Sequence, residues 1–274
     1  TVITHDVDMP PCLPTDGHGL RRRFLFVRYI PVDGTHVLLF SPVGMQADGY
    51  RYRNVFQTGY LLGDFDYDSA KLTHAGFEEI DRGHDFYASQ TFETPDGRRV
   101  CIGWMNMWQT PMPEQRDGWA GALTLPRELH VVDGKVSMTP IRELTSLRAD
   151  VLVERADAFT DHETLVTLTK NQAEVLFSCA DLNESGSVGL SFDVGAGKSV
   201  DFGYDRANGL LTLDRGGADG VRAYACGALR RLDLRVYVDN SSLEVFVNEG
   251  LATFTSRIYP TAPIRVESAP PPER

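Results

Sequence analysis

Short β-type segments separated by turn residues run through almost the whole sequence, and they constrain its fold more than any other feature. Examples are HVLLF at 36–40, RRVCIGWM at 98–105, AEVLFSCA at 173–180 and SLEVFVN at 242–248. They are rich in β-branched and aromatic residues and are bounded by Gly, Asp, Asn or Pro, as strands are. Dipeptides such as Asp33-Gly34, Asp133-Gly134 and Asn208-Gly209 are typical of hairpin turns. The sequence therefore predicts an all-β protein.

One segment, TPIRELTSLRAD at 139–150, has the pattern of a helix. Thr139 is placed to cap it and Pro140 to open its first turn, while three apolar residues share one face. The segment predicts a linker helix at 139–150 between two β domains, at 1–138 and 151–274. The regular strands after it favour a sandwich. The less even strands before it, with loops rich in Trp, Tyr, Asp and Gly, are typical of a propeller or another loop-bearing β scaffold.

The composition limits the classes of partner and of cofactor. A formal net charge of −11 argues against nucleic acid and anionic membrane as partners. No apolar run is long enough to span a membrane, and the first residues do not resemble a secretory signal, so a cytoplasmic location is the default expectation. The four cysteines are widely spaced, which favours buried thiols over a disulfide scaffold. The histidines are scattered, so we expect no metal and no cofactor. The oligomeric state stays open.

The densest polar cluster is EEIDRGHDFYASQTF at 78–92. An Asp beside a Tyr, with Gln90 nearby, offers hydrogen-bonding groups for hydroxyls and a ring on which a sugar can stack. Strand alternation would place Asp85, Tyr87 and Ser89 on one face. Taken alone, however, these residues are more typical of a polar strand end whose hydrogen bonds are satisfied in a turn.

A second cluster, at 103–129, contains all three tryptophans of the chain around a Pro-rich loop. Tryptophans beside Asn, Gln and Asp suit a carbohydrate site, because apolar sugar faces stack on the rings and fixed polar groups bind the hydroxyls. The alternative is that some of them only pack, which we favour for Trp119.

Four blocks of this sequence resemble glycoside hydrolase family 32, the family of invertases, sucrose-6-phosphate hydrolases, levanases and inulinases. The blocks lie at 36–66, at DRGHDFYASQTF (81–92), at GWMNMW with DGWAGALTLPREL (103–129), and at VDNSSLEVFVNEGLATFTSRIYP (238–260). The resemblance runs from about Gly34 to Pro260. It implies part of a five-bladed β-propeller that carries the active site, followed by a C-terminal β-sandwich.

The resemblance also implies a chemistry, namely hydrolysis of β-fructofuranosides such as sucrose, sucrose 6-phosphate or fructans. The mechanism would be a retaining double displacement between two carboxylates. The family carries its nucleophile in a Trp-Met-Asn-Asp-Pro-Asn-like motif and its acid/base in Glu-Cys-Pro-Asp, and it also has an Arg-Asp-Pro motif. This sequence has none of them, so we assign no catalytic residue and expect the first blades to be absent ahead of Thr1. Asp85, Tyr87 and Trp104 match positions that line the family's sugar pocket and are the candidate substrate-binding residues.

The stretch GLRRRFLFVRYIPVDGTHVLLFSP at 19–42 occupies the place where the acid/base motif is expected. No glutamate occurs between Thr1 and Val55, and an arginine does not release a proton at working pH. We hypothesise that Arg21–Arg28 is foreign to the family, as a frameshift or rearrangement would produce. Matching sequence would then resume near Tyr29.

Three functions remain open at this point. The chain is part of a β-fructofuranosidase that is inactive by itself, a non-catalytic relative that binds fructosides or packs against a partner, or a lectin-like sandwich. The propeller blocks disfavour the third. A partial propeller also leaves sheet edges exposed, which predicts aggregation or edge-to-edge pairing.

Overall fold

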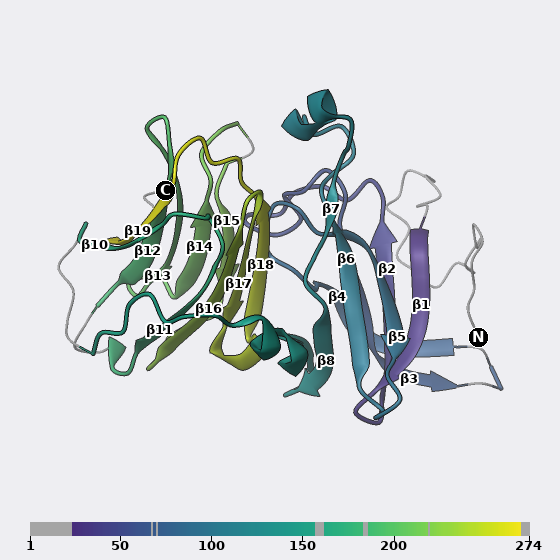
Figure 1. Cartoon of the computed structure of the whole chain (residues 1–274). Helices are drawn as coiled ribbons and strands as arrows, with labels where there is room; N and C mark the ends of the chain where they lie inside the picture. Colours follow the sequence, from purple (N-terminus) through teal and green to yellow (C-terminus); the bar gives the residue numbers. More distant parts are fainter. Residues whose placement is uncertain are drawn as a thin grey trace. The chain divides into compact units, whose positions relative to one another are not determined.

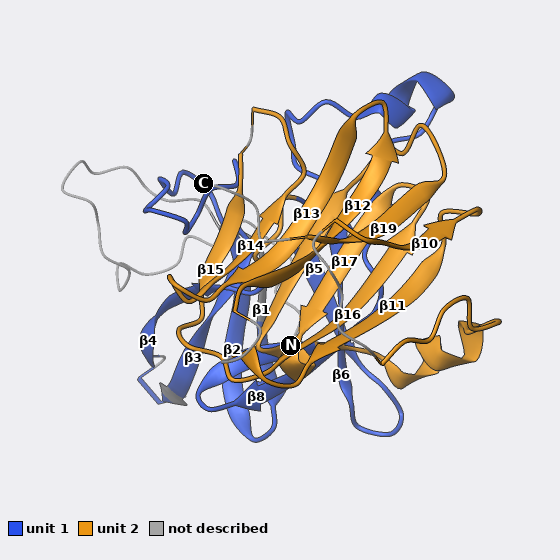
Figure 2. Cartoon of the chain, turned by 90° about the vertical axis from the view of Figure 1, so that its left-hand side faces the viewer, with its two compact units in different colours: residues 1–81, 85–138 blue, residues 82–84, 139–274 orange. Residues whose placement is uncertain are grey.

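The computed structural model describes residues 24–66, 68–69, 71–156, 162–182, 186–218 and 220–269. Antiparallel strands dominate these ranges (Figure 1), which confirms the all-β prediction. The chain divides into two compact units, coloured separately in Figure 2. Unit 1 comprises residues 1–81 and 85–138, and unit 2 comprises residues 82–84 and 139–274.

Unit 1 contains two sheets in its described part. The first has the order β1-β2-β3-β4 and consists of Phe24–Val32, Thr35–Pro42, Gly59–Asp66 and Lys71–Glu79. The second has the order β5-β6-β8-β9, with β7 paired to β6, and consists of Tyr87–Glu93, Arg99–Met105, Ala122–Leu123, Arg127–Val132 and Lys135–Pro140. Both sheets contribute to one buried apolar cluster, in which Val37 and Leu39 of the first sheet lie with Cys101 and Leu129 of the second.

The β1–β2 hairpin forms where the sequence predicts a turn. Asp33 and Gly34 both adopt positive φ, 46° and 77°, and Val32 pairs directly with Thr35. This is the backbone that Asp-Gly supplies in two-residue hairpin turns. Within β1, Arg28 pairs with Leu39, whereas Arg21–Arg23 lie outside the described residues.

Unit 2 is a sandwich of two antiparallel sheets. One sheet has the order β10-β19-β12-β13-β14-β15, formed by Thr164–Leu168, Ile264–Ala269, Val188–Gly195, Lys198–Asp205, Leu210–Asp214 and Arg222–Ala225. The other has the order β11-β16-β17-β18, formed by Ala173–Cys179, Leu232–Asp239, Ser242–Val247 and Ala252–Arg257. Side chains alternate strictly between buried and partly exposed along β16 up to Val238. The inward residues, among them Val236, Phe202 and Phe254, form the core between the sheets.

The helix predicted at 139–150 is shorter and of a different type. Strand β9 continues through Pro140, and a 3₁₀ helix follows at Arg142–Leu147. Two hydroxyls of this turn bond to backbone oxygens three residues back, Thr145 Oγ1 to Arg142 at 2.8 Å and Ser146 Oγ to Glu143 at 2.7 Å. Such local bonds compete with α-helix formation. The expected apolar face also finds no core, since Leu147 is 77% exposed, and a short helix depends on such packing.

Two further 3₁₀ segments lie at Pro113–Asp117 and Asn248–Gly250. In the described part of the chain, every helix falls short of the length and apolar character needed to cross a membrane.

Candidate functional site

Two of the three predicted site residues face each other across a strand pair in unit 1. Tyr87 opens β5 and pairs with Trp104 of β6, and their ring centroids are 6.5 Å apart in an edge-on arrangement. Asp85 precedes β5 by two residues and is fully buried, as is Tyr87 at 1% exposure. Burial raises the pKa of the Tyr87 hydroxyl, which therefore stays protonated and able to donate. The geometry thus brings Tyr87 and Trp104 together, with Asp85 on the same short segment.

The alternation expected along 85–90 is interrupted by a β-bulge. The β5–β6 register shifts between Tyr87 and Gln90, and Ala88 adopts a positive φ of 52°. Asp85, Phe86 and Tyr87 are all buried, as is Ser89, while Ala88 and Gln90 are more exposed. The assignment of Asp85 and Phe86 to opposite faces stays a prediction. Bulges are common next to binding sites.

Thr58 holds the bulge in place. Its Oγ1 accepts the Ala88 amide proton at 3.2 Å and shares a buried hydrogen bond with Ser41 Oγ at 2.9 Å. Ser41 belongs to β2, so this chain of bonds ties the first sheet of unit 1 to the beginning of β5. The site segment is therefore anchored on the scaffold rather than on a free loop.

A buried ion pair fixes the other side of the segment. Arg127 Nη1 donates to Asp81 Oδ2 at 2.8 Å, with side-chain exposures of 0% and 1%. The Arg127 guanidinium also lies over the Phe86 ring, 4.9 Å from its centroid. Removing one partner of a buried ion pair leaves the other charge buried without water or a counter-charge, so such a change is strongly destabilising. The pair ties Asp81, four residues before Asp85, to strand β8.

The loop between β6 and β7 packs on the Trp104 indole. Gly121, at a φ of 71°, lies so close that an added Cβ would be 2.2 Å from Trp104 Nε1. The Gly121 amide donates to Glu114 Oε1 at 3.2 Å, and Glu114 is only 4% exposed. Beside Trp104 in the sequence, the Gly103 amide donates to Thr124 Oγ1 at 3.0 Å. The backbone at Gly121 therefore packs on the indole, and hydrogen bonds fix the position of this backbone and of strand β6.

The aromatic side chains form a continuous row, Phe56, Tyr87, Trp104 and Trp108. Successive ring centroids are 5.6 Å apart between Phe56 and Tyr87 and 5.1 Å apart between Trp104 and Trp108. Exposure rises from Tyr87 at 1%, through the partly buried Trp104, to Trp108 at 55%, while Phe56 at the other end is partly exposed. Rings that lead from a buried carboxyl to the surface can present their faces to a sugar.

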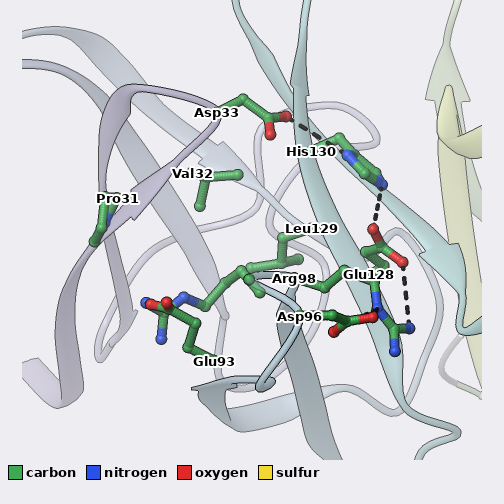
Figure 3. Close-up of a pocket in the computed structure, with 11 residues that line it drawn as sticks. Pro31, Val32, Asp33, Glu93, Asp96, Arg98, Glu128, Leu129 and His130 are labelled. Atoms are coloured by element: carbon green, nitrogen blue, oxygen red, sulfur yellow. Dashed lines mark hydrogen bonds and ion pairs between the residues drawn. The ribbon is translucent and has the colours of Figure 1, made fainter.

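A cleft lies at the opposite end of the β5–β6 hairpin (Figure 3). This cleft of about 230 Å³ is lined by residues from the β1–β2 turn, the β5–β6 turn and β8. His130 lies 3.5 Å from Asp33 and 3.4 Å from Glu128, while Arg98 lies 3.0 Å from Asp96. Ion pairs join several of the charged side chains in this cleft, among them Arg98 with Asp96 and Glu128, and none of the three predicted site residues lines it.

Two family models match successive parts of the chain. Residues 24–140 match the model of the glycosyl hydrolases family 32 N-terminal domain, and residues 143–269 match that of the family 32 C-terminal domain. The chain belongs to glycosyl hydrolase family 32. Unit 1 is accordingly part of the family's β-propeller and unit 2 its β-sandwich.

Relatives include sucrose-6-phosphate hydrolase of Zymomonas mobilis, 39% identical over 82% of this chain and 46% of that protein. A raffinose invertase of Escherichia coli is 40% identical over 84% of this chain and 48% of that protein. The solved GH32 β-fructofuranosidase of Bombyx mori is 31% identical with a TM-score of 0.82, covering 94% of this chain and 53% of its own. The chain spans about half the length of the curated relatives it matches.

The family match corrects one hypothesis about the arginine-rich stretch. The family model already begins at Phe24, and β1 pairs with β2 from Phe24 onwards. The interpretation that matching sequence resumes only near Tyr29 is therefore wrong, because the family match begins at Phe24, although the β1–β2 register shifts between Leu25 and Arg28. For Arg21–Arg23 the hypothesis stays a prediction.

Several residues that shape the site escaped sequence reasoning. Arg127 and Thr58 act through contacts with residues distant along the chain, 46 positions away for Asp81 and 30 for Ala88, whereas Glu114 bonds to Gly121 within one loop. A charged residue inside a Leu-rich strand, as in LPREL, is the one signal that could have indicated a buried pair.

Proposed function

We propose that this chain forms one wall of a β-fructofuranoside-binding pocket and the sandwich domain of a family 32 glycosidase. The observation that carries the proposal is the pairing of Tyr87 with Trp104 beside buried Asp85. It is supported by the names of the relatives, which are sucrose-6-phosphate hydrolases and invertases, and by a variant of the Bombyx mori enzyme solved in complex with sucrose. A buried acid beside two rings suits a fructosyl unit, whose hydroxyls need hydrogen-bond partners and whose C–H face needs an aromatic surface.

In this proposal Asp85 binds sugar hydroxyls, while Tyr87 and Trp104 form the pocket wall. The intact family mechanism would place two carboxylates about 5 to 5.5 Å apart on either side of the anomeric carbon. The sequence offers no match to the family motif of either carboxylate. We therefore propose that the 274-residue chain binds fructosides without hydrolysing them.

The test combines a binding assay with an activity assay on the purified chain. Calorimetric titration with methyl β-D-fructofuranoside should show binding that weakens in Asp85→Asn and Trp104→Ala, whereas Phe92→Ala should leave it unchanged. Phe92 is an apt control because it is an exposed aromatic at the far end of the same hairpin, 49% exposed and paired with Val100. Glucose and fructose release from sucrose and from sucrose 6-phosphate should be absent. Turnover of either sugar would overturn the inactivity, and failure of the folded chain to bind would overturn the proposed function.

A further inference from the structure

The turn between β13 and β14 contains the dipeptide Asn208-Gly209. Asp205 pairs with Leu210 across this turn, so residues 206–209 connect the two strands, and Asn208 is exposed. Gly209 adopts a positive φ of 62°. In an asparagine–glycine pair the glycine nitrogen can attack the side-chain amide with little hindrance, because glycine has no Cβ and adopts many backbone conformations. The turn therefore holds a chemically reactive pair of residues.

Hydrogen bonds hold both residues of this pair in place. Asn208 Nδ2 donates to Asp205 Oδ2 at 2.6 Å, and the Asn208 backbone amide donates to Asp205 Oδ1 at 3.3 Å. The Gly209 carbonyl accepts from the Cys226 and Gly227 amides at 3.0 and 3.1 Å. In the described part of the chain the Gly209 amide itself donates to no other group, so its nitrogen can react without first breaking a hydrogen bond. Because both reacting groups lie in one ordered turn, the entropic cost of their reaction is lowered.

We propose that Asn208 is a site of self-modification by deamidation, with water as the only co-reactant. The Gly209 nitrogen attacks Asn208 Cγ, so a bond forms between these two atoms and the nitrogen loses its proton. The bond from Cγ to Nδ2 breaks, and Nδ2 takes up a proton and leaves as ammonia. Water then opens the resulting five-membered imide at one of its two carbonyls. The product is an aspartate or an isoaspartate in place of Asn208.

Either product disturbs the turn and its link to the segment that follows β15. An aspartate places a second carboxylate against Asp205, where Nδ2 donated a hydrogen bond, so like charges replace an attractive contact. An isoaspartate adds a methylene to the backbone and displaces Gly209, which is packed so tightly that an added Cβ would lie 2.9 Å from the Gly227 backbone. The bonds from the Cys226 and Gly227 amides then weaken. The modification therefore lowers the stability of unit 2 as the protein ages.

The experiment follows the folded full chain during incubation in mildly alkaline buffer. Peptide mapping by mass spectrometry measures the conversion of each asparagine, and enzymatic methylation detects isoaspartate. Asn240 is the internal control, because it is also exposed in a hairpin turn and its Nδ2 lies 3.3 Å from Asp239 Oδ1, but a serine follows it. We expect Asn208 to be modified about tenfold faster than Asn240, a difference of ~1.4 kcal/mol in activation free energy.

Two variants test the consequence for stability by urea unfolding. Asn208→Gln, which cannot form the five-membered imide, should keep its unfolding midpoint during the incubation while that of the wild type decreases. Asn208→Asp should show a lower midpoint from the start. Equal rates at Asn208 and Asn240 would overturn the proposed site, as would an unmodified Asn208 in the folded chain when the urea-unfolded chain is modified there. Equal midpoints of Asn208→Asp and the wild type, with no loss in the wild type on incubation, would overturn the effect on stability.

Discussion

His84 is a buried imidazole in unit 2, 1% exposed. Its Nε2 lies 2.9 Å from the Gly220 carbonyl and its Nδ1 lies 3.1 Å from Ser256 Oγ. The carbonyl can only accept, so Nε2 carries a proton. Because the pKa of His84 is lowered well below its usual range, the ring is neutral, its Nδ1 accepts from the Ser256 hydroxyl, and both ring nitrogens are bonded in the folded chain.

This arrangement predicts a pH-dependent stability. Burial, together with the charges of Arg215 and Arg222, lowers the pKa of His84 well below its usual range. The unfolded chain, with an ordinary histidine pKa of about 6.5, binds the proton more readily than the folded chain. His84 thus contributes its full stability above about pH 6.5, and the free energy of unfolding decreases as the pH falls below it, by at most about 1.4 kcal/mol per pH unit.

Urea unfolding followed at a series of pH values measures this effect. His84→Gln is the matched variant, because its amide can donate to Gly220 and accept from Ser256 but does not titrate. Its unfolding midpoint should vary less with pH below about 6.5 than that of the wild type. Identical pH profiles would show that other groups account for the loss of stability.

At the scale of elements, the loop between β6 and β7 matters because its Gly121 packs against the Trp104 side chain of the candidate site. The loop contains two glycines with positive φ, Gly118 at 86° and Gly121 at 71°. A Cβ at Gly118 would meet nothing within 4 Å, whereas a Cβ at Gly121 would collide with the Trp104 indole. A substitution at Gly118 therefore tests backbone strain alone, whereas a substitution at Gly121 also displaces the Trp104 side chain.

We predict different outcomes for Gly118→Ala and Gly121→Ala. Both should lose about 1–2 kcal/mol of stability from the left-handed backbone. Only Gly121→Ala should also move Trp104, changing the tryptophan emission and weakening the binding of methyl β-D-fructofuranoside. Equal emission spectra and equal affinities in the two variants would show that the loop yields without moving the indole.

At the scale of the whole molecule, the described residues of unit 1 form two sheets, with β1 and β4 as the outer strands of the first. A propeller protects its sheets by closing a ring, and an unprotected sheet tends to associate with another. We predict that the chain self-associates with increasing concentration. Size-exclusion chromatography with light scattering measures this directly. A monomer at all concentrations that unfolds in a single cooperative transition would contradict the prediction.

Much of the fold was predictable because its signals are local. Strand segments such as 36–40 and 242–248, and the Asp33-Gly34 turn, depend on side-chain alternation and on backbone preferences within a few residues. For the candidate site, the sequence predicted which residues belong to it but not how they are arranged. Which of them touch, and how far each is exposed, depends on how strands distant in the sequence pair and pack.

The sequence by itself determined an all-β fold, and it predicted Asp85 and Tyr87 on one segment and Trp104 on another as candidate binding residues. Tertiary structure alone decided that Asp85 and Phe86 are both buried, that Arg127 pairs with Asp81, and that Trp108 stays exposed. It also decided that residues 142–147 form a 3₁₀ turn instead of an α-helix. The physical reason is common to all of these, since each depends on burial and on partners that only the folded chain brings into contact.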